Sequence, residues 1–229
     1  LRLRGGVSLF ASWNKSLRLP TFTDLYYKSP TQEGNTGLRP EECSAFRIGA
    51  DWRTRVSVTS VKAYYNRGTD MIDWVMYAPD DIYHASNFSL DNMGVGFSSA
   101  LDLRAWWGSK QPLRRFTVNY SYIYQHRRDG TAYFKSNYAL EYLRHKFTAT
   151  LTHEIWSHLS ASWTLRVQDR EGAYLLWRDG ASTGELHPYG AHALLDCKLQ
   201  WKAPRYELFV DMTNLTACRY YDLANVRQP

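Results

Sequence analysis

The chain consists largely of stretches in which apolar and polar residues alternate. The clearest is residues 205–215, where Leu208 and Val210 fall on one side of an extended chain and Glu207 and Asp211 on the other. Similar alternation occurs in residues 46–52, 95–105, 116–125, 147–155, 159–168 and 191–201. Successive side chains of a β-strand point to opposite faces, so these stretches predict strands with one apolar and one polar face.

The connections between the predicted strands are alternately short and long. Tight turns are expected at residues 53–55, 107–112, 157–158 and 202–204, and long loops at residues 14–42, 77–84, 126–137, 171–189 and 216–224. This alternation places all tight turns at one end of an up-and-down sheet, as in outer-membrane barrels with short periplasmic turns and long extracellular loops. A soluble β-sandwich has no reason to sort its connections in this way. The pattern therefore predicts an all-β fold: an up-and-down antiparallel transmembrane β-barrel, or a piece of one.

Tryptophans gather beside the predicted tight turns. They are Trp52, Trp106, Trp107, Trp156 and Trp201. Indoles at headgroup depth form the aromatic girdle of a membrane barrel. The alternative is that they are ordinary core residues, but Trp106 and Trp156 fall out of phase with the apolar faces of their strands.

Composition agrees with a barrel and disfavours two other classes. Of the 229 residues, 15% are aromatic, which suits a barrel with two girdles. The chain has no apolar run near the ~18–20 residues that a transmembrane helix requires. Its net charge of +6 suggests nucleic acid as a partner, but Lys and Arg are spread out without a basic run, so we predict no nucleic-acid binding. Basic residues near the loop ends are instead expected to meet lipopolysaccharide phosphates.

The sequence offers no candidate metal or cofactor site and no catalytic site. Cys43, Cys197 and Cys218 lack metal-ligand spacing, and the seven histidines form no zinc motif. Cys197 lies in an apolar phase and is expected to face lipid, while a disulfide between the other two cysteines stays open. His153 with Glu154, and His187 and His192 near Asp196, could serve in acid–base catalysis. No serine, however, lies in a turn of the kind that activates a nucleophile. We therefore predict that the protein is not an enzyme.

The first long connection carries several short motifs in a characteristic order. It contains Arg18-Leu19-Pro20, then Asp24-Leu25-Tyr26, then Gly34-Asn35-Thr36-Gly37-Leu38-Arg39-Pro40-Glu41. This series resembles the β-barrel domain of TonB-dependent outer-membrane receptors. The resemblance continues in residues 64–74, in Ala85-Ser86-Asn87 with Gly94, and in Asn214-Leu215 before Tyr220-Tyr221-Asp222. It covers essentially the whole chain.

The resemblance implies one domain over residues 1–229, the C-terminal portion of such a barrel without its plug domain and last strand. That portion comprises about nine strands of a barrel of about 22. The chain begins inside an apparent strand without a signal peptide, so we expect it to be an excised piece of a longer protein. The motif residues Pro20, Pro40, Gly34, Gly37 and Asn214 are expected to shape loops and strand ends rather than bind ligand.

By the same resemblance, the protein imports a scarce nutrient across the bacterial outer membrane. The substrate is expected to be an iron–siderophore, cobalamin or a similar metal chelate. The implied partners are outer-membrane lipid and lipopolysaccharide, the chelate, and the TonB complex through the absent N-terminal region. The alternatives are another outer-membrane barrel, either a passive porin or a barrel hydrolase, and a soluble carbohydrate-binding β-sandwich.

Candidate substrate contacts lie in the long loops. They are Tyr26, Tyr27, Tyr83, Arg127, Arg128, Tyr174 and Trp177. The alternative for the aromatic residues is an upper girdle or loop packing, and for the two arginines a solvated loop tip.

Overall fold

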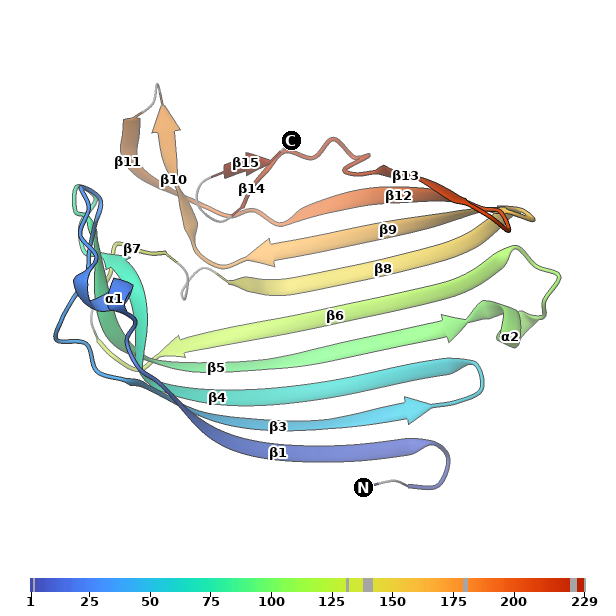
Figure 1. Ribbon diagram of the computed structural model, residues 1–229, viewed down its shortest axis with the longest axis horizontal. Coiled ribbons are helices and arrows are strands. Elements are labelled where there is room, and N and C mark those ends of the chain that lie inside the picture. The colour runs from blue at the N-terminus through green and yellow to red at the C-terminus, as the bar shows by residue number, and fades with distance from the viewer. Residues whose placement is uncertain (2, 131, 138–141, 179–180, 223–225, 229) are drawn as a thin grey trace.

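The computed structural model describes residues 1, 3–130, 132–137, 142–178, 181–222 and 226–228, and its dominant feature is one long antiparallel sheet (Figure 1). The long strands are β1 (Val7–Arg18), β3 (Glu41–Arg53), β4 (Ser57–Met76), β5 (Tyr83–Asp102), β6 (Leu113–Arg127), β8 (Leu143–Trp156), β9 (Leu159–Arg170), β12 (His192–Lys202) and β13 (Glu207–Met212). Each pairs with the next in chain order, and the sheet stays open between β1 and β13. An up-and-down barrel fragment of nine long strands is confirmed for the described residues.

The remaining elements are short. Strand β2 (Gln32–Glu33) pairs with β5, and β7 (Lys135–Ser136) pairs with β4. Two separate hairpins are formed by β10 (Ala173–Arg178) with β11 (Ala181–Pro188), and by β14 (Tyr220–Asp222) with β15 (Val226–Gln228). The helices are α1 (Phe22–Tyr26) and α2 (Leu103–Trp107). In the described part of the chain, no helix has the length and apolar character needed to cross a membrane.

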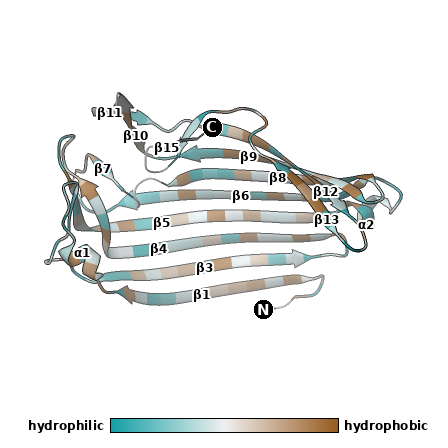
Figure 2. Cartoon of the chain, turned by 45° about the horizontal axis from the view of Figure 1, so that its top comes forward, coloured by the Kyte–Doolittle hydropathy of each residue, from teal (hydrophilic) through white to brown (hydrophobic). Residues whose placement is uncertain are grey.

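The register separates an apolar from a polar face across the sheet. One row of paired residues runs Leu9, Ala50, Val61, Phe97, Tyr120, Phe147, Val167 and Ala193. The next row, on the opposite face, runs Phe10, Gly49, Lys62, Gly96, Ser121, Lys146, Gln168 and His192. Hydroxyl pairs such as Thr150 with Thr164 add hydrogen bonds on the polar face (3.0 Å). Apolar and polar bands accordingly alternate along the ribbons (Figure 2).

The sorting of connections by length is confirmed, with differences in where they begin. Tight turns lie at one end of the sheet, together with α2, and the long connections lie at the other (Figure 1). Strand β1 continues to Arg18, and the expected loop 171–189 is mostly the β10–β11 hairpin. The strands extend beyond the apolar band into segments that are polar on both faces. Such segments do not alternate between apolar and polar residues, so the sequence predicts them as loops.

The tryptophans at the tight turns are exposed, which rules out the core interpretation. The exposed fractions are 52% for Trp52, 55% for Trp106, 60% for Trp107, 69% for Trp156 and 38% for Trp201. Trp106 and Trp156 fall out of phase with the apolar faces of their strands because of the local backbone. Trp106 lies in α2, where Asp102 caps the helix by accepting a hydrogen bond from the Ala105 amide (3.0 Å). A register shift between Glu154 and Trp156 brings the latter opposite Leu159.

Cys197 departs from its expected environment. It lies on the apolar face, opposite Trp163 and Met212, but its exposed fraction is 2%. The surrounding side chains therefore cover this small thiol instead of leaving it open on the predicted lipid-facing surface. All three cysteines are free, so Cys43 and Cys218 form no disulfide in this structure.

Candidate functional site

The long-loop end begins with a connection that folds over the β4–β5 hairpin. Thr21 and Asp24 form a capping box at the start of α1, and Arg18 also pairs with Asp24 (3.3 Å). Leu38 then packs into a small apolar core with Trp74 and Ala85. This connection therefore forms a packed layer on the long-loop end of the β4–β5 hairpin.

Glycine contributes here through close packing. A Cβ at Gly34 would lie 2.9 Å from the Asp24 carbonyl oxygen, and Gly37 donates its amide to the Asn35 side chain (2.9 Å). Neither glycine has the positive φ expected of a special turn conformation. The architectural role predicted for Gly34 thus comes from the approach of two backbones.

The first group of predicted contacts belongs to this layer. Tyr83 packs against the Leu38–Trp74–Ala85 core, and Tyr27 meets the ring of Trp74 edge-on (6.3 Å between centroids). Tyr26 is 59% exposed and lies 4.9 Å from the ring of Phe22. Of these three tyrosines, Tyr26 leaves the most ring surface open.

The second group, Arg127 and Arg128, is engaged with the protein itself. Arg127 pairs with Asp129 (3.0 Å) and lies over the ring of Tyr133 (4.5 Å). Arg128 pairs with Asp91 (2.9 Å) and donates a hydrogen bond to the carbonyl oxygen of Gly68 (2.7 Å). These contacts of Arg128 fix the loop after β6 to the β4–β5 hairpin, whereas those of Arg127 stay within that loop.

The third group lies at the base of the β10–β11 hairpin. Tyr174 stacks on Tyr221 with 4.0 Å between ring centroids and a 10° interplanar angle. His187 and Tyr189 each lie 5.7 Å from the same ring. We call these four residues the aromatic cluster. Trp177 pairs with Ser182 in the hairpin, but its side chain lies outside the described residues.

An ion pair ties the aromatic cluster to the main sheet. Arg170, at the end of β9, pairs with Asp222 (2.7 Å) and lies 5.6 Å from the ring of Tyr189. Beside it, His192 stacks on Tyr220 (4.2 Å). This ion pair joins the end of β9 to β14, although Arg170 and Asp222 are 52 residues apart in the sequence.

Sequence reasoning found Tyr174 but missed its partners. Tyr220-Tyr221-Asp222 was recognised as a motif, without a role at a site. His187, Tyr189 and His192 carried no spacing signal, because they meet only after the hairpin has folded back. The predicted contacts therefore form three groups, and the structure does not gather them into one pocket.

The polar face carries two adjoining cavities below the loops. One, of about 330 Å³, is lined by Ser60, Lys62, Gly96, Phe97, Ser98, Asn119, Tyr120, Ser121, Lys146 and Thr148. The other, of about 240 Å³, is lined by Phe10, Arg47, Ile48, Lys62, Ala63, Tyr64, Asn66 and Asn92. Lys62 borders both cavities. Serine, threonine and asparagine make these surfaces suitable for hydrogen bonding.

Local charge pairs shift the titration of loop carboxylates. The hydrogen bond with His84 (3.1 Å) lowers the pKa of Asp81, and amide hydrogen bonds from Tyr77 and Ile82 act in the same direction. Hydrogen bonding to Lys28 (2.8 Å) likewise lowers the pKa of Glu33. These pairs lie at the protein surface and set local loop geometry.

The histidines considered for catalysis have other surroundings. His153 lies opposite Ala161 on the apolar face and accepts a hydrogen bond from the Trp163 indole (3.2 Å). Within the described ranges, no group of three or more His, Cys, Asp or Glu side chains is arranged to hold a metal ion.

Comparison with known proteins identifies the family. The family model described as TonB dependent receptor-like, beta-barrel matches residues 2–215. The chain belongs to the TonB-dependent receptor family. A curated relative, the vitamin B12 transporter BtuB of Vibrio vulnificus, is 34% identical over 89 residues, which are 39% of this chain and 14% of the relative.

Solved structures of TonB-dependent receptors share the fold at low sequence identity. The copper transporter OprC has a TM-score of 0.71 at 13% identity, over 96% of this chain and 33% of its own. The ferric enterobactin receptor PfeA of Pseudomonas aeruginosa has a TM-score of 0.69 at 14% identity, over 100% of this chain and 38% of its own. The siderophore receptor PirA of Acinetobacter baumannii has a TM-score of 0.71 at 14% identity, over 100% and 38%. This chain therefore spans about a third of the length of these TonB-dependent receptors.

Proposed function

We propose that this chain forms the C-terminal part of the barrel of a bacterial outer-membrane receptor that imports a scarce metal chelate with energy from the TonB complex. The family match over residues 2–215 carries the proposal. The relatives are named as transporters or receptors for vitamin B12, copper and ferric enterobactin, and the substrate class of this receptor is taken from that range.

The two faces of the sheet support membrane insertion. The row from Leu9 to Ala193 presents apolar side chains on one face, which suits lipid, and the row from Phe10 to His192 presents polar ones, which suits a lumen. The exposed tryptophans at the tight turns suit the periplasmic interface.

The long-loop end supplies the proposed ligand contacts. Tyr26, Tyr27, Tyr83, Arg127, Arg128, Tyr174 and Trp177 remain the candidates. Among the side chains that the structure describes, we favour Tyr174 and Tyr26. Tyr174 belongs to the aromatic cluster, whose stacked rings suit a flat conjugated chelate. Tyr26 has an exposed side chain. Arg127 and Arg128 would act mainly by holding the loop.

Uptake by the full-length receptor tests the proposal. Labelled cobalamin and a panel of labelled ferric siderophores are supplied to cells with and without TonB, with the receptor expressed in a strain lacking its own uptake systems. We expect one chelate to accumulate only with TonB and an intact proton-motive force. A passive porin would admit solutes regardless of TonB, so TonB-independent accumulation would favour that alternative.

The ligand site is tested by shortening residues 171–189 in the same receptor. Uptake and chelate binding should fall while the amount of folded barrel stays unchanged, because binding loops sit on a scaffold that folds without them. Tyr174→Ala should reproduce part of the loss, and Tyr174→Phe should retain most of the activity because the stacking ring remains. Unchanged binding after the deletion would remove the hairpin from the site.

A further inference from the structure

Most basic side chains at the long-loop end of the sheet have carboxylate partners, whereas most of those at the tight-turn end do not. At the long-loop end, carboxylates pair with Arg18, Lys28, Arg39, Arg127, Arg128, Arg144 and Arg170. At the tight-turn end, seven exposed basic residues make no ion pair within the described part of the chain: Arg4, Arg53, Arg55, Lys110, Arg115, Lys202 and Arg205. We call these seven the turn-end basic residues.

Several carboxylates near them already have partners, and Asp51, which lines the same hollow as Arg53, forms no ion pair with it in the described part of the chain. Glu154 pairs with Arg104 and Arg114, and Asp102 caps α2. Glu207 accepts a hydrogen bond from Gln200 (2.5 Å). Most of the positive charge of the turn-end basic residues therefore has no ion-pair partner within the described part of the chain.

These residues follow the edge of the sheet from turn to turn. Arg4 lies in the turn before β1, which the Arg53 amide joins through a hydrogen bond to Gly6 (2.9 Å). Arg55 lies in the β3–β4 turn, and Lys110 in the connection from α2 to β6. Lys202 and Arg205 flank the β12–β13 turn. The charge thus extends along the rim that Figure 1 shows at the right, with a gap at the β8–β9 turn.

Exposed indoles lie directly beside this rim. Trp52 precedes Arg53, and Trp201 precedes Lys202. Trp106 and Trp107 stack on each other in α2 (5.3 Å, 17°), three residues before Lys110. Indoles favour the headgroup region of a bilayer, and long basic side chains extend from there toward the phosphates.

We propose that the tight-turn rim binds anionic phospholipids, with the indoles against the upper acyl chains and the turn-end basic residues on the headgroup phosphates. The proposal rests on the membrane placement given above. A lipid is the occupant that fits, because its phosphate and its apolar chain are joined in one molecule and the rim offers charge and exposed apolar surface in the same order. A nucleic acid or an acidic peptide would match the charge and leave the indoles unused.

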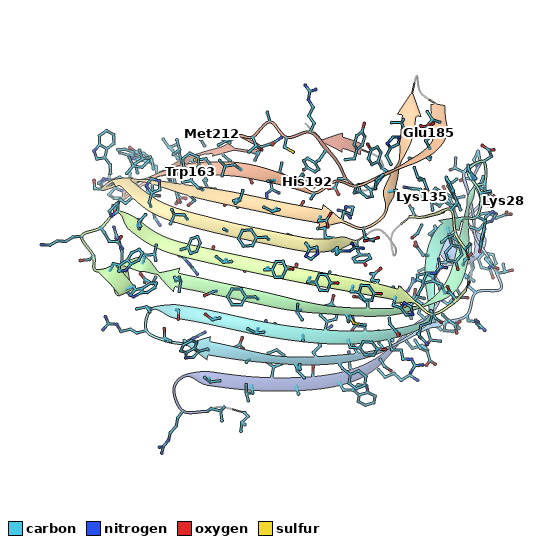
Figure 3. All side chains as sticks on the ribbon, turned by 180° about the vertical axis from the view of Figure 1, so that it is seen from behind. Lys28, Lys135, Trp163, Glu185, His192 and Met212 are labelled. Carbon is cyan, nitrogen blue, oxygen red and sulfur yellow. The ribbon has the colours of Figure 1, made fainter. Side chains whose placement is uncertain are left out.

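The lipopolysaccharide contacts expected near the loop ends stay a prediction, and the rim adds a second basic surface at the opposite end of the sheet. The sequence suggested basic residues near loop ends as partners for lipopolysaccharide. Lys28, which Figure 3 labels at the long-loop end, instead pairs with Glu33 (2.8 Å), and Arg39 pairs with Asp70 (2.6 Å). The unpaired charge lies at the end of the sheet where Figure 3 labels Trp163.

The test compares two variants of the full-length receptor that lose the same charge. The first combines Arg55→Gln, Lys110→Gln and Arg205→Gln at the rim. The control combines Lys15→Gln, Lys28→Gln and Arg39→Gln, whose side chains have carboxylate partners near the other end. Each is inserted into vesicles of phosphatidylcholine mixed with phosphatidylglycerol, and spin-labelled forms of both lipids report the ratio of their association with the protein.

The unmodified receptor should prefer phosphatidylglycerol several-fold at low salt, and the preference should weaken as salt is added. A basic residue near an anionic surface changes association by about fivefold, so the rim variant should lose most of the preference for phosphatidylglycerol while the control keeps it. Equal losses in both variants would show a response to net charge and overturn the proposal. So would normal insertion without any preference, which would leave the proposed uptake function intact. Failure of the unmodified receptor to insert into these vesicles would overturn both this proposal and the proposed function.

Discussion

At the scale of single residues, the paired faces of β13 fix what each side chain meets. Val210 lies opposite Leu199, and Leu208 lies opposite Trp201, one pair nearer to the tight turn. Asp211 lies on the polar face and pairs with Lys198 (3.3 Å). The alternation seen in the sequence is confirmed. The register also shows how far each residue lies from the tight turn.

That register predicts an order of costs for arginine substitutions in the full-length receptor refolded into lipid vesicles. Arg costs about 2–4 kcal/mol on a lipid face at the midplane and about 0–1 kcal/mol near the interface. Val210→Arg should therefore lower the free energy of unfolding more than Leu208→Arg. Asp211→Arg, in a wet lumen, should cost about 1 kcal/mol through the lost exposed pair. If Asp211→Arg proved the most damaging of the three, the assignment of faces would be wrong.

Asn214 combines an unusual backbone with a local hydrogen-bond network. Its φ is +52°, its side-chain oxygen accepts from the Cys218 amide (3.0 Å), and its side-chain nitrogen donates to the Cys218 carbonyl (2.9 Å). This confirms the strand-end role read from the sequence.

We expect Asn214→Ala to cost about 2–3 kcal/mol, because alanine pays about 1–2 kcal/mol in the left-handed region and the hydrogen bonds are lost. Asn214→Gly keeps the backbone freedom and should cost about half as much. Urea unfolding of the vesicle-bound receptor measures both variants. Equal stability of the two would show that backbone strain contributes nothing at this position.

At the scale of elements, a carboxylate organises the tip between β4 and β5. Asp81 accepts hydrogen bonds from the amides of Tyr77 (3.3 Å) and Ile82 (2.8 Å) and from His84 (3.1 Å). The pKa of this carboxyl is lowered, so its contribution to local order is complete above its ordinary value of 3.8.

As the pH falls through the lower pKa of the folded state, that contribution should be lost. Amide exchange at Tyr77 and Ile82, corrected for the intrinsic effect of pH, should then accelerate while exchange in the centre of β5 stays slow. Asp81→Asn should remove the pH response. A wild-type tip whose corrected exchange is the same above and below this range would contradict the role of the carboxylate.

At the scale of the whole molecule, the described chain is an open sheet with two unpaired edges. The apolar face exposes Ile48 at 61%, together with the row that runs from Leu9 to Ala193. No other element of the main sheet covers its two edge strands, β1 and β13, or its apolar face. Such surfaces favour association between copies.

The isolated 229-residue chain should therefore aggregate in plain buffer and become dispersed in detergent. Size-exclusion chromatography with circular dichroism in the two conditions measures this. A monodisperse folded monomer without detergent would contradict membrane insertion and favour the soluble β-sandwich.

The sequence by itself determined the strands, their two faces and the sorting of turns from loops. A side-chain period of two is local, so Leu208 and Asp211 could be assigned to opposite faces without knowing their neighbours. The same holds for the motifs around Asn214, whose hydrogen bonds span four residues.

Only the tertiary structure decided what the long connections build. Tyr174 meets Tyr221, and Arg128 meets Asp91, across dozens of residues, and no local period records such contacts. The turn-end basic residues also became one surface only when adjacent turns were brought together by strand pairing. Side-chain alternation fixes the sheet locally, whereas these contacts depend on how separate connections fold over its two ends.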